Sequence, residues 1–213
     1  MKRLILCTLS CITLFVSQPL SAGSSFEDEL KDSSSGTVSS RFRVGYSAGI
    51  GYQGRISGDG DTKIQGLLLE VGLYGLFNPI RNFFDIEIGL NGKYNTGMSS
   101  TSSSYGKTTY YAGLKQVTIY GGTVFRLGGS AKALCVGVSK AIYINEVQSD
   151  ELKASGYKKH DLENGIGAYI EYQTDEMDGS IFFTRVELEK IDIVSETQIS
   201  NDTVGSILFG MKF

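Results

Sequence analysis

Apolar and polar side chains alternate along most of residues 41–213. Over residues 42–52 every even position is apolar: Phe42, Val44, Tyr46, Ala48, Ile50 and Tyr52. Over residues 84–95 the alternation repeats, with Phe84, Ile86, Ile88 and Leu90 on one face and Asp85, Glu87, Asn91 and Lys93 on the other. Because successive side chains of a strand point to opposite faces, this period of two predicts strands with one apolar face and one small or polar face.

Six further segments follow the same rule: 63–77, 109–127, 133–145, 162–173, 180–191 and 203–213. The connections between the predicted strands alternate in length. Longer polar links span 55–62, 96–108, 146–161 and 192–202, and tight turns span 78–82, 128–130 and 174–179. Short turns at one rim and long loops at the other are typical of membrane barrels. The sequence therefore predicts an all-β fold, an eight-stranded antiparallel up-and-down transmembrane β-barrel over residues 41–213.

A soluble barrel or sandwich shows the same alternation, but its apolar face points inward. Two features indicate that the apolar face points outward, toward lipid. Small glycines lie among the polar positions, as a narrow lumen requires. Aromatic residues on the apolar face are sorted to the strand ends, with Phe42 and Tyr52 ten residues apart, as are Phe84 and Tyr94. Ten tilted residues cover roughly 25 Å, about the height of a lipid-facing band between aromatic girdles.

The polar face is thus expected to line the barrel interior. Eight strands leave a lumen that side chains fill, and opposite charges there should pair because an unpaired buried charge is costly. The predicted lumen charge network consists of Arg41, Arg43, Glu70, Asp85, Glu87, Lys93, Glu163, Glu171, Arg185, Glu187, Glu189 and Lys212. Lys140 falls on the lipid face in simple register, so we expect a bulge near Ser139 to turn it inward and Tyr143 outward.

The first 22 residues have the features of a secretory signal peptide. Lys2 and Arg3 precede an apolar stretch over 4–16, and the segment Leu20-Ser21-Ala22, which ends in small residues, suits signal peptidase. A membrane anchor, or a lipoprotein modified at Cys11, are the alternatives. Residues 23–40 are Ser-rich and are expected to form a flexible periplasmic leader. Loss of the two basic residues takes the formal charge from −3 to −5, which argues against a nucleic-acid partner.

The last predicted strand carries apolar residues at alternate positions: Ile207, Phe209, Met211 and Phe213. This pattern resembles the C-terminal signal that the barrel-assembly machinery reads. Together with the patterned strands, residues 41–213 resemble small eight-stranded bacterial outer-membrane barrels of the OmpX and OmpA-barrel type. The resemblance implies a location in the cell outer membrane, contact with outer-membrane lipid including lipopolysaccharide, and the assembly machinery as a partner during biogenesis.

Candidate chemistry is sparse. His160 is the single histidine, and its sequence neighbours match no hydrolase spacing, although Asp59, Asp61 and Asp161 mimic the acidic composition of omptin proteases. A solvated loop residue is the expected role for His160. Asp59 and Asp61 are ordinary turn residues, and Cys135 is expected to be a small buried filler. We predict no catalytic residues, no metal site and no cofactor.

The leading hypothesis is a non-enzymatic barrel with a structural or surface-interaction role in adhesion or in the envelope. Contacts with an extracellular ligand would be made by the loops at 99–104 and 146–159. The alternatives are a narrow porin-like channel and a lipid A-modifying or omptin-like enzyme.

Overall fold

A computed structural model describes residues 41–80, 84–101, 108–127, 132–177, 180–194 and 198–213. The predicted signal peptide (1–22) and periplasmic leader (23–40) lie outside these residues. No helix among the described residues is long and apolar enough to cross a membrane.

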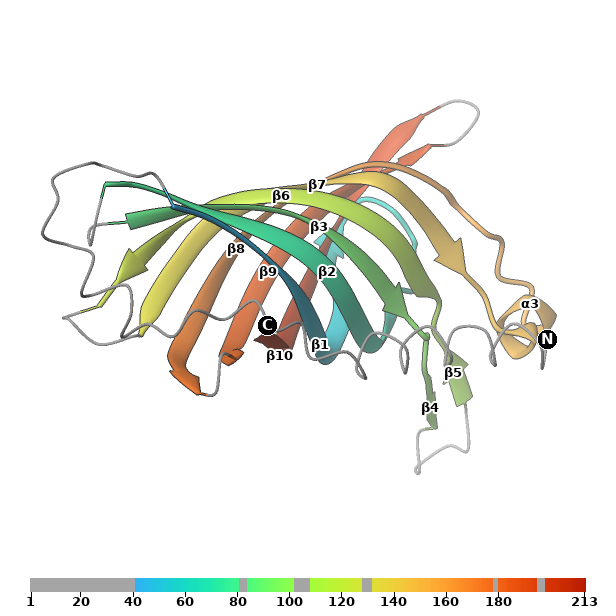
Figure 1. Cartoon of the computed structure of the whole chain (residues 1–213). Helices are drawn as coiled ribbons and strands as arrows, with labels where there is room; N and C mark the ends of the chain where they lie inside the picture. The colour runs from blue at the N-terminus through green and yellow to red at the C-terminus, as the bar shows by residue number, and fades with distance from the viewer. Residues whose placement is uncertain (1–40, 81–83, 102–107, 128–131, 178–179, 195–197) are drawn as a thin grey trace, which may run out of the picture. The chain divides into compact units, whose positions relative to one another are not determined.

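Eight strands form a closed barrel in the order β1-β10-β9-β8-β7-β6-β3-β2, and each neighbouring pair is antiparallel (Figure 1). The predicted up-and-down topology is confirmed. The strands are β1 (Arg41–Gly58), β2 (Gln65–Ile80), β3 (Phe84–Asn95), β6 (Gly113–Arg126), β7 (Ala133–Val147), β8 (Asp161–Met177), β9 (Ser180–Val194) and β10 (Ile199–Lys212).

The barrel closes between β1 and β10. Their register runs from Ser47 opposite Lys212 to Gly58 opposite Asp202. One position beyond Ser47 and Lys212, the backbone N–H groups of Tyr46 and Phe213 each donate to the carbonyl of the other, at 3.1 and 2.9 Å. Closure removes the unpaired strand edges that a lipid environment does not tolerate.

Three short elements lie in the connections between the barrel strands. Strands β4 (Ser99–Thr101) and β5 (Thr108–Tyr110) pair with each other, and helix α3 (Asp150–Ala154) follows β7. The sequence alternation did not predict them. The expected long polar link at 192–202 is also mostly strand, because β9 continues to Val194 and β10 begins at Ile199.

Burial in the barrel is the reverse of that in a water-soluble protein. Large apolar side chains are exposed along the outer wall, with Val44 71% and Val138 64% exposed. Charged side chains are buried in the interior, with Glu87 0% and Lys212 1% exposed. Since lysine and glutamate are almost never fully buried unless paired, while exposed apolar walls are unfavourable in water, this arrangement fits a wall that faces lipid.

The expectation that Lys140 turns inward is wrong. Lys140 is exposed on the outer wall opposite Ile119, and the ladder shifts only beyond it, where Ile142 is the extra residue between Ala141 and Tyr143. Tyr143 is exposed, as expected. The bulge lies past Lys140 because Ser139 keeps its inward place, where its hydroxyl donates to Glu187 Oε1 at 2.5 Å.

The expectation that Glu163 lines the lumen is also wrong. The β8–β9 ladder shifts between Glu163 and Ile166, and Asn164 there has a φ of 47°. This bulge interrupts the alternation, so that Leu162 is buried and Glu163 is exposed. A left-handed backbone at an asparagine is tolerated, but its position cannot be read from a period of two.

Candidate functional site

Lys212 is the last residue of β10, and its side chain is buried in the lumen. Its ammonium donates to both carboxylate oxygens of Glu87 at 2.7 Å and to Glu171 Oε1 at 2.6 Å. All three side chains are fully buried. Because β10 and β3 are not neighbours in the barrel order, the Lys212–Glu87 pair crosses the interior instead of running along the wall.

Arg185 on β9 makes a second crossing. Its Nη1 donates to Glu70 Oε1 on β2 at 2.8 Å, and its Nε donates to Glu171 Oε2 on β8 at 2.8 Å. The guanidinium lies 5.1–5.3 Å from the ring centroids of three aromatic residues, Phe183, Tyr120 and Tyr169. A planar cation that binds two carboxylates and packs on aromatic rings fills the space around it.

Lys93 on β3 and Glu187 on β9 form the longest crossing, because these strands lie four places apart in a ring of eight. Lys93 Nζ donates to Glu187 Oε2 at 2.5 Å. One step toward the loops, Gln116 Nε2 donates to both oxygens of Glu189 at 2.9 and 3.0 Å. Charges of both signs therefore meet across the lumen at successive levels.

Four of the predicted lumen residues lie outside this central cluster. Arg43 and Glu163 are exposed, and the side chain of Arg41 lies outside the described atoms. Asp85 lies near the turn end of β3, where Asn78 Nδ2 donates to it at 2.6 Å and Arg126 Nη2 at 3.1 Å. The structure brings together the other eight: Glu70, Glu87, Lys93, Glu171, Arg185, Glu187, Glu189 and Lys212.

An apolar layer closes the lumen on its loop side. It lies at the strand ends nearest the long connections, and it is formed by Ile64, Leu114, Leu162, Ile191, Ile193 and Val204. Sequence reasoning missed this layer because it assigned inward positions to polar residues only. The available signal was that alternate residues Ile191 and Ile193 continue the inward face of Glu187 and Glu189.

The predicted assembly-signal residues line the outer wall of β10. Ile207, Phe209 and Phe213 are exposed, and Met211 is half-buried. The Phe213 ring stacks on Tyr46 of β1 with centroids 5.0 Å apart. The C-terminal aromatic residue is thus part of the closing seam.

His160 is not the solvated residue that the sequence led us to expect, since its side chain is only 15% exposed. Its Nε2 lies 2.6 Å from Asp61 Oδ1, and its Nδ1 lies 3.0 Å from Oε2 of the buried Glu146. The hydroxyl of Tyr157 lies 3.1 Å from Nδ1 and accepts a bond from the Lys63 backbone N–H at 3.0 Å. Burial raises the pKa of the Tyr157 phenol. This cluster joins the β1–β2 connection to the β7–β8 connection.

Asp202 at the loop end of β10 also binds the β1–β2 connection. It accepts bonds from the Gly60 backbone N–H at 3.1 Å and from the Thr62 hydroxyl, and it pairs with Arg55 Nε at 3.0 Å. Arg55 in turn donates to the carbonyls of Gly58 and Gly60 at 2.9 and 2.6 Å. These contacts fix the β1–β2 connection to β10 and to the β7–β8 connection, and we call the surface formed by residues 55–64 and 146–160 the loop-side platform.

Neither His160 nor Cys135 is placed for catalysis. Both ring nitrogens of His160 face carboxylates, so neither is left to take a proton from a nucleophile, as base catalysis requires. Cys135 is buried, and its thiol donates to the Tyr169 hydroxyl at 3.7 Å. Within the described residues, no group of three or more His, Cys, Asp or Glu side chains is arranged to hold a metal ion.

Comparison with known proteins adds a likeness of fold. No family model matches the chain, and no curated protein matches it significantly. Neisserial surface protein A (NspA) is similar, with 11% identity and a TM-score of 0.46, over 82% of this chain and 97% of that chain. Outer membrane protein OprG from Pseudomonas aeruginosa has 14% identity and a TM-score of 0.43, over 81% of this chain and 95% of that chain. The small eight-stranded architecture that the sequence resembles is confirmed by the closed barrel itself.

Proposed function

We propose that this protein is a non-enzymatic outer-membrane barrel that does not conduct, and that it acts through its loop-side surface in a structural or surface-interaction role. The observation that carries the proposal is the set of ion pairs that cross the lumen between non-neighbouring strands, with Lys93–Glu187 at 2.5 Å as the longest crossing. A conducting pore needs a continuous water path between its walls, and these pairs occupy that path.

The lumen is filled at more than one level. On the turn side of the apolar layer, a second buried cluster packs among the charged groups, with Arg185 on the Tyr120 and Tyr169 rings and Lys212 on the Tyr74 ring. Its members are Tyr74, Tyr120, Val124, Ala133, Cys135 and Tyr169. A hydrated ion moving through the barrel would have to separate buried ion pairs and cross an apolar constriction, both of which carry large desolvation costs. The porin-like alternative is thus disfavoured by the packing of the interior.

Two features support the outer membrane as the location. The outer wall is apolar, and its aromatic residues lie toward the strand ends, with Phe42 and Phe182 near one rim and Tyr52 and Tyr94 near the other. Closed barrels with such girdles belong to outer-membrane bilayers. On this proposal lipopolysaccharide and other lipids surround the wall, and the barrel-assembly machinery inserts the chain.

The loop-side platform supports a surface-interaction role. The β4 strand is fully exposed, and α3 presents exposed Asp150, Glu151 and Lys153 while its Leu152 is buried. The His160 and Asp202 contacts hold the connections that flank these elements. Preorganised loops lose less entropy on binding than free ones, so a braced platform suits contact with a partner. Since both His160 nitrogens face carboxylates, the structure offers less support for an enzyme.

Planar lipid bilayers test the proposal. Purified protein should first show the heat-dependent shift on SDS gels that a folded barrel gives, since closed barrels pair their backbone groups in the lipid zone. Added to bilayers at neutral pH, it should produce no more current than detergent alone. Stable, reproducible single-channel conductance from the folded protein would overturn the plugged interior and establish the channel alternative.

A further inference from the structure

Two lysines stand on the outer wall of the barrel at matched positions. Lys140 on β7 is opposite Ile166 on β8, and Ile166 is opposite Lys190 on β9. Both lysine side chains are exposed. Their backbones are two strand spacings apart, roughly 10 Å, which two long flexible side chains can bridge to one ligand. Within the described part of the chain, neither ammonium has a carboxylate oxygen within 4.0 Å.

Both lysines lie in the loop-side half of the wall. Lys190 is eight residues beyond Phe182 on an ascending strand, which places it roughly 20 Å above the turn-side girdle in a band of about 25 Å. Lys140 precedes the outward Tyr143 by three residues. An ammonium at this depth is tolerated because its stem follows the apolar wall while its charge reaches the headgroup zone. The acidic pair Glu163 and Asp192 lies nearer to the loops on the same strands.

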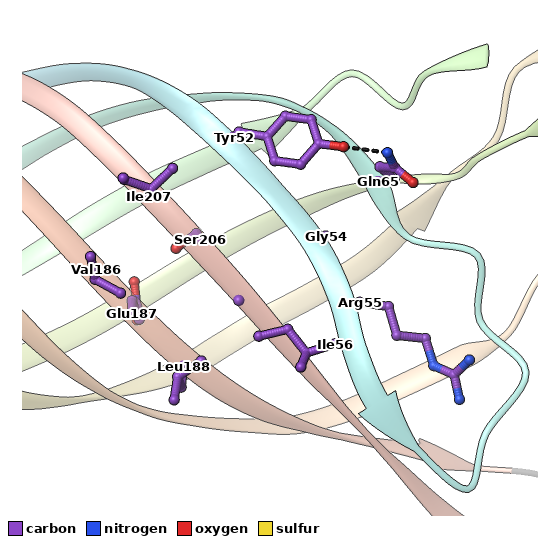
Figure 2. A pocket seen from close by; sticks show the side chains of 11 residues that line it. Tyr52, Gly54, Arg55, Ile56, Gln65, Val186, Glu187, Leu188, Ser206 and Ile207 are labelled. Atoms are coloured by element: carbon purple, nitrogen blue, oxygen red, sulfur yellow. Dashed lines mark hydrogen bonds between the residues drawn. The ribbon is translucent and has the colours of Figure 1, made fainter. Parts of the chain in front are cut away.

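An open hollow of about 430 Å³ lies over β1, β9 and β10 on the same outer wall (Figure 2). Its apolar lining comes from Tyr52, Ile56, Val186, Leu188 and Ile207 on β1, β9 and β10. Ile56 packs directly on Gly205, where a Cβ would come within 2.4 Å of Ile56 Cδ1. Ile56 is the extra residue where the β1–β10 register shifts, so a bulge shapes this edge of the hollow.

The hollow and the lysine pair meet at β9. Leu188 lines the hollow, and Lys190 follows it two residues later on the same face, one step toward the loops. Arg55, Gln65, Glu187 and Ser206 also line the hollow, but its surface is mostly apolar. Such a hollow accepts a hydrocarbon chain, and the two lysine ammoniums nearer to the loops attract an anion. A phosphate is the anion that membrane lipids place at this depth, and lysine binds phosphate as a point charge.

We propose that Lys140, Lys190 and the hollow beside Leu188 form a binding site for a phosphorylated lipid of the loop-side leaflet, namely the phosphate-bearing lipid portion of lipopolysaccharide. The phosphate is held between the two ammoniums above Ile166, and one acyl chain lies in the hollow against Leu188 and Ile56. This assignment rests on the proposed outer-membrane location.

Native mass spectrometry of the full-length folded protein in detergent tests the site. The probes are diphosphorylated lipid A and lipid A from which both phosphates have been removed, with identical acyl chains. The variants are Lys140→Gln, Lys190→Gln and their combination. The matched control is Lys115→Gln, because Lys115 is also exposed on the outer wall but lies opposite Tyr94 and Asn145, away from the pair. Each variant must retain the heat-dependent gel shift.

The wild type should bind the phosphorylated probe at least about tenfold more tightly than the dephosphorylated one, the equivalent of one charge-assisted contact. The double variant should lose this preference, and Lys115→Gln should keep it. Equal binding of the two probes by the wild type, or an unchanged preference in the double variant, would overturn the site. Separate fractionation of cell envelopes distinguishes the two proposals, because absence from the outer membrane would refute the location and not the lipid selectivity of the purified protein.

Discussion

The Lys93–Glu187 pair allows the strongest test of whether ion pairs fill the lumen. It joins opposite walls, and the two side chains make few other hydrogen bonds. Replacement of Lys93 by Met leaves the buried Glu187 carboxylate without its ion-pair partner, and the Ser139 hydroxyl remains as a neutral hydrogen-bond donor to it. Breaking a buried ion pair by removal of one partner costs about 3–5 kcal/mol, most of it from the charge left behind. We therefore expect Lys93→Met to lower the free energy of unfolding by that amount.

Removal of both charges should be less harmful. In Lys93→Met with Glu187→Gln, both charges of the pair are gone, and the new amide oxygen can still accept a bond from Ser139. The double variant should thus be more stable than Lys93→Met alone, with a coupling energy of about 2 kcal/mol or more between the two sites. The matched control is the surface pair Lys153–Asp150, whose side chains are 59% and 87% exposed. Such pairs contribute less than about 1 kcal/mol.

Reversible urea unfolding in lipid vesicles provides the assay. The folded fraction is measured from the compact band on unheated SDS gels and from the circular dichroism of the strands. If Lys93→Met destabilises the barrel no more than Lys153→Met does, or if the double variant is as unstable as the sum of its singles, the lumen is hydrated at this level and the plugged interior is wrong.

Two other variants probe the seam and the platform. Deletion of Phe213 removes two backbone hydrogen bonds and the ring stacked on Tyr46 at the closing seam, so we expect reduced amounts of folded barrel in the membrane fraction; normal amounts would show that the seam closes without it. His160→Ala removes the contacts to Asp61 and Glu146, and trypsin should then cleave at Lys158 and Lys159 faster than in the wild type; an unchanged cleavage rate in folded protein would mean that the β7–β8 connection is held elsewhere.

The sequence predicted the wall well because a single rule, the alternation of strand faces, decides it. Phe42 to Tyr52 and Phe84 to Leu90 share the lipid face as expected, and the seam residues of β10 do so too. Two residues assigned to the wrong face lie at bulges. Lys140 and Glu163 were assigned inward positions, but the shifts fall at Ile142 and near Asn164, where backbone geometry and not hydrophobic pattern determines the face.

The contacts of the loop-side platform could not be predicted from the sequence for a different reason. His160 and Asp61 are far apart in the sequence, and nothing in the local composition of either connection indicates that they meet at 2.6 Å. The same holds for the partners in the lumen: periodicity identified Lys212 and Glu87 as inward, but it could not select Glu87 from the other acidic residues. Such choices depend on strand order and on the relative heights of the strands around the barrel.

The seam between β1 and β10 also constrains how this protein is made. Since it joins the first strand of the barrel to the last, its contacts have the greatest sequence separation in the fold, and topologies of such high contact order fold slowly. Until β10 arrives, β1 and the growing sheet both present open edges, which invite aggregation in water and are forbidden in lipid. A chain that lacks β10 therefore cannot close, and the unfinished sheet has to be sheltered until the final strand is in place.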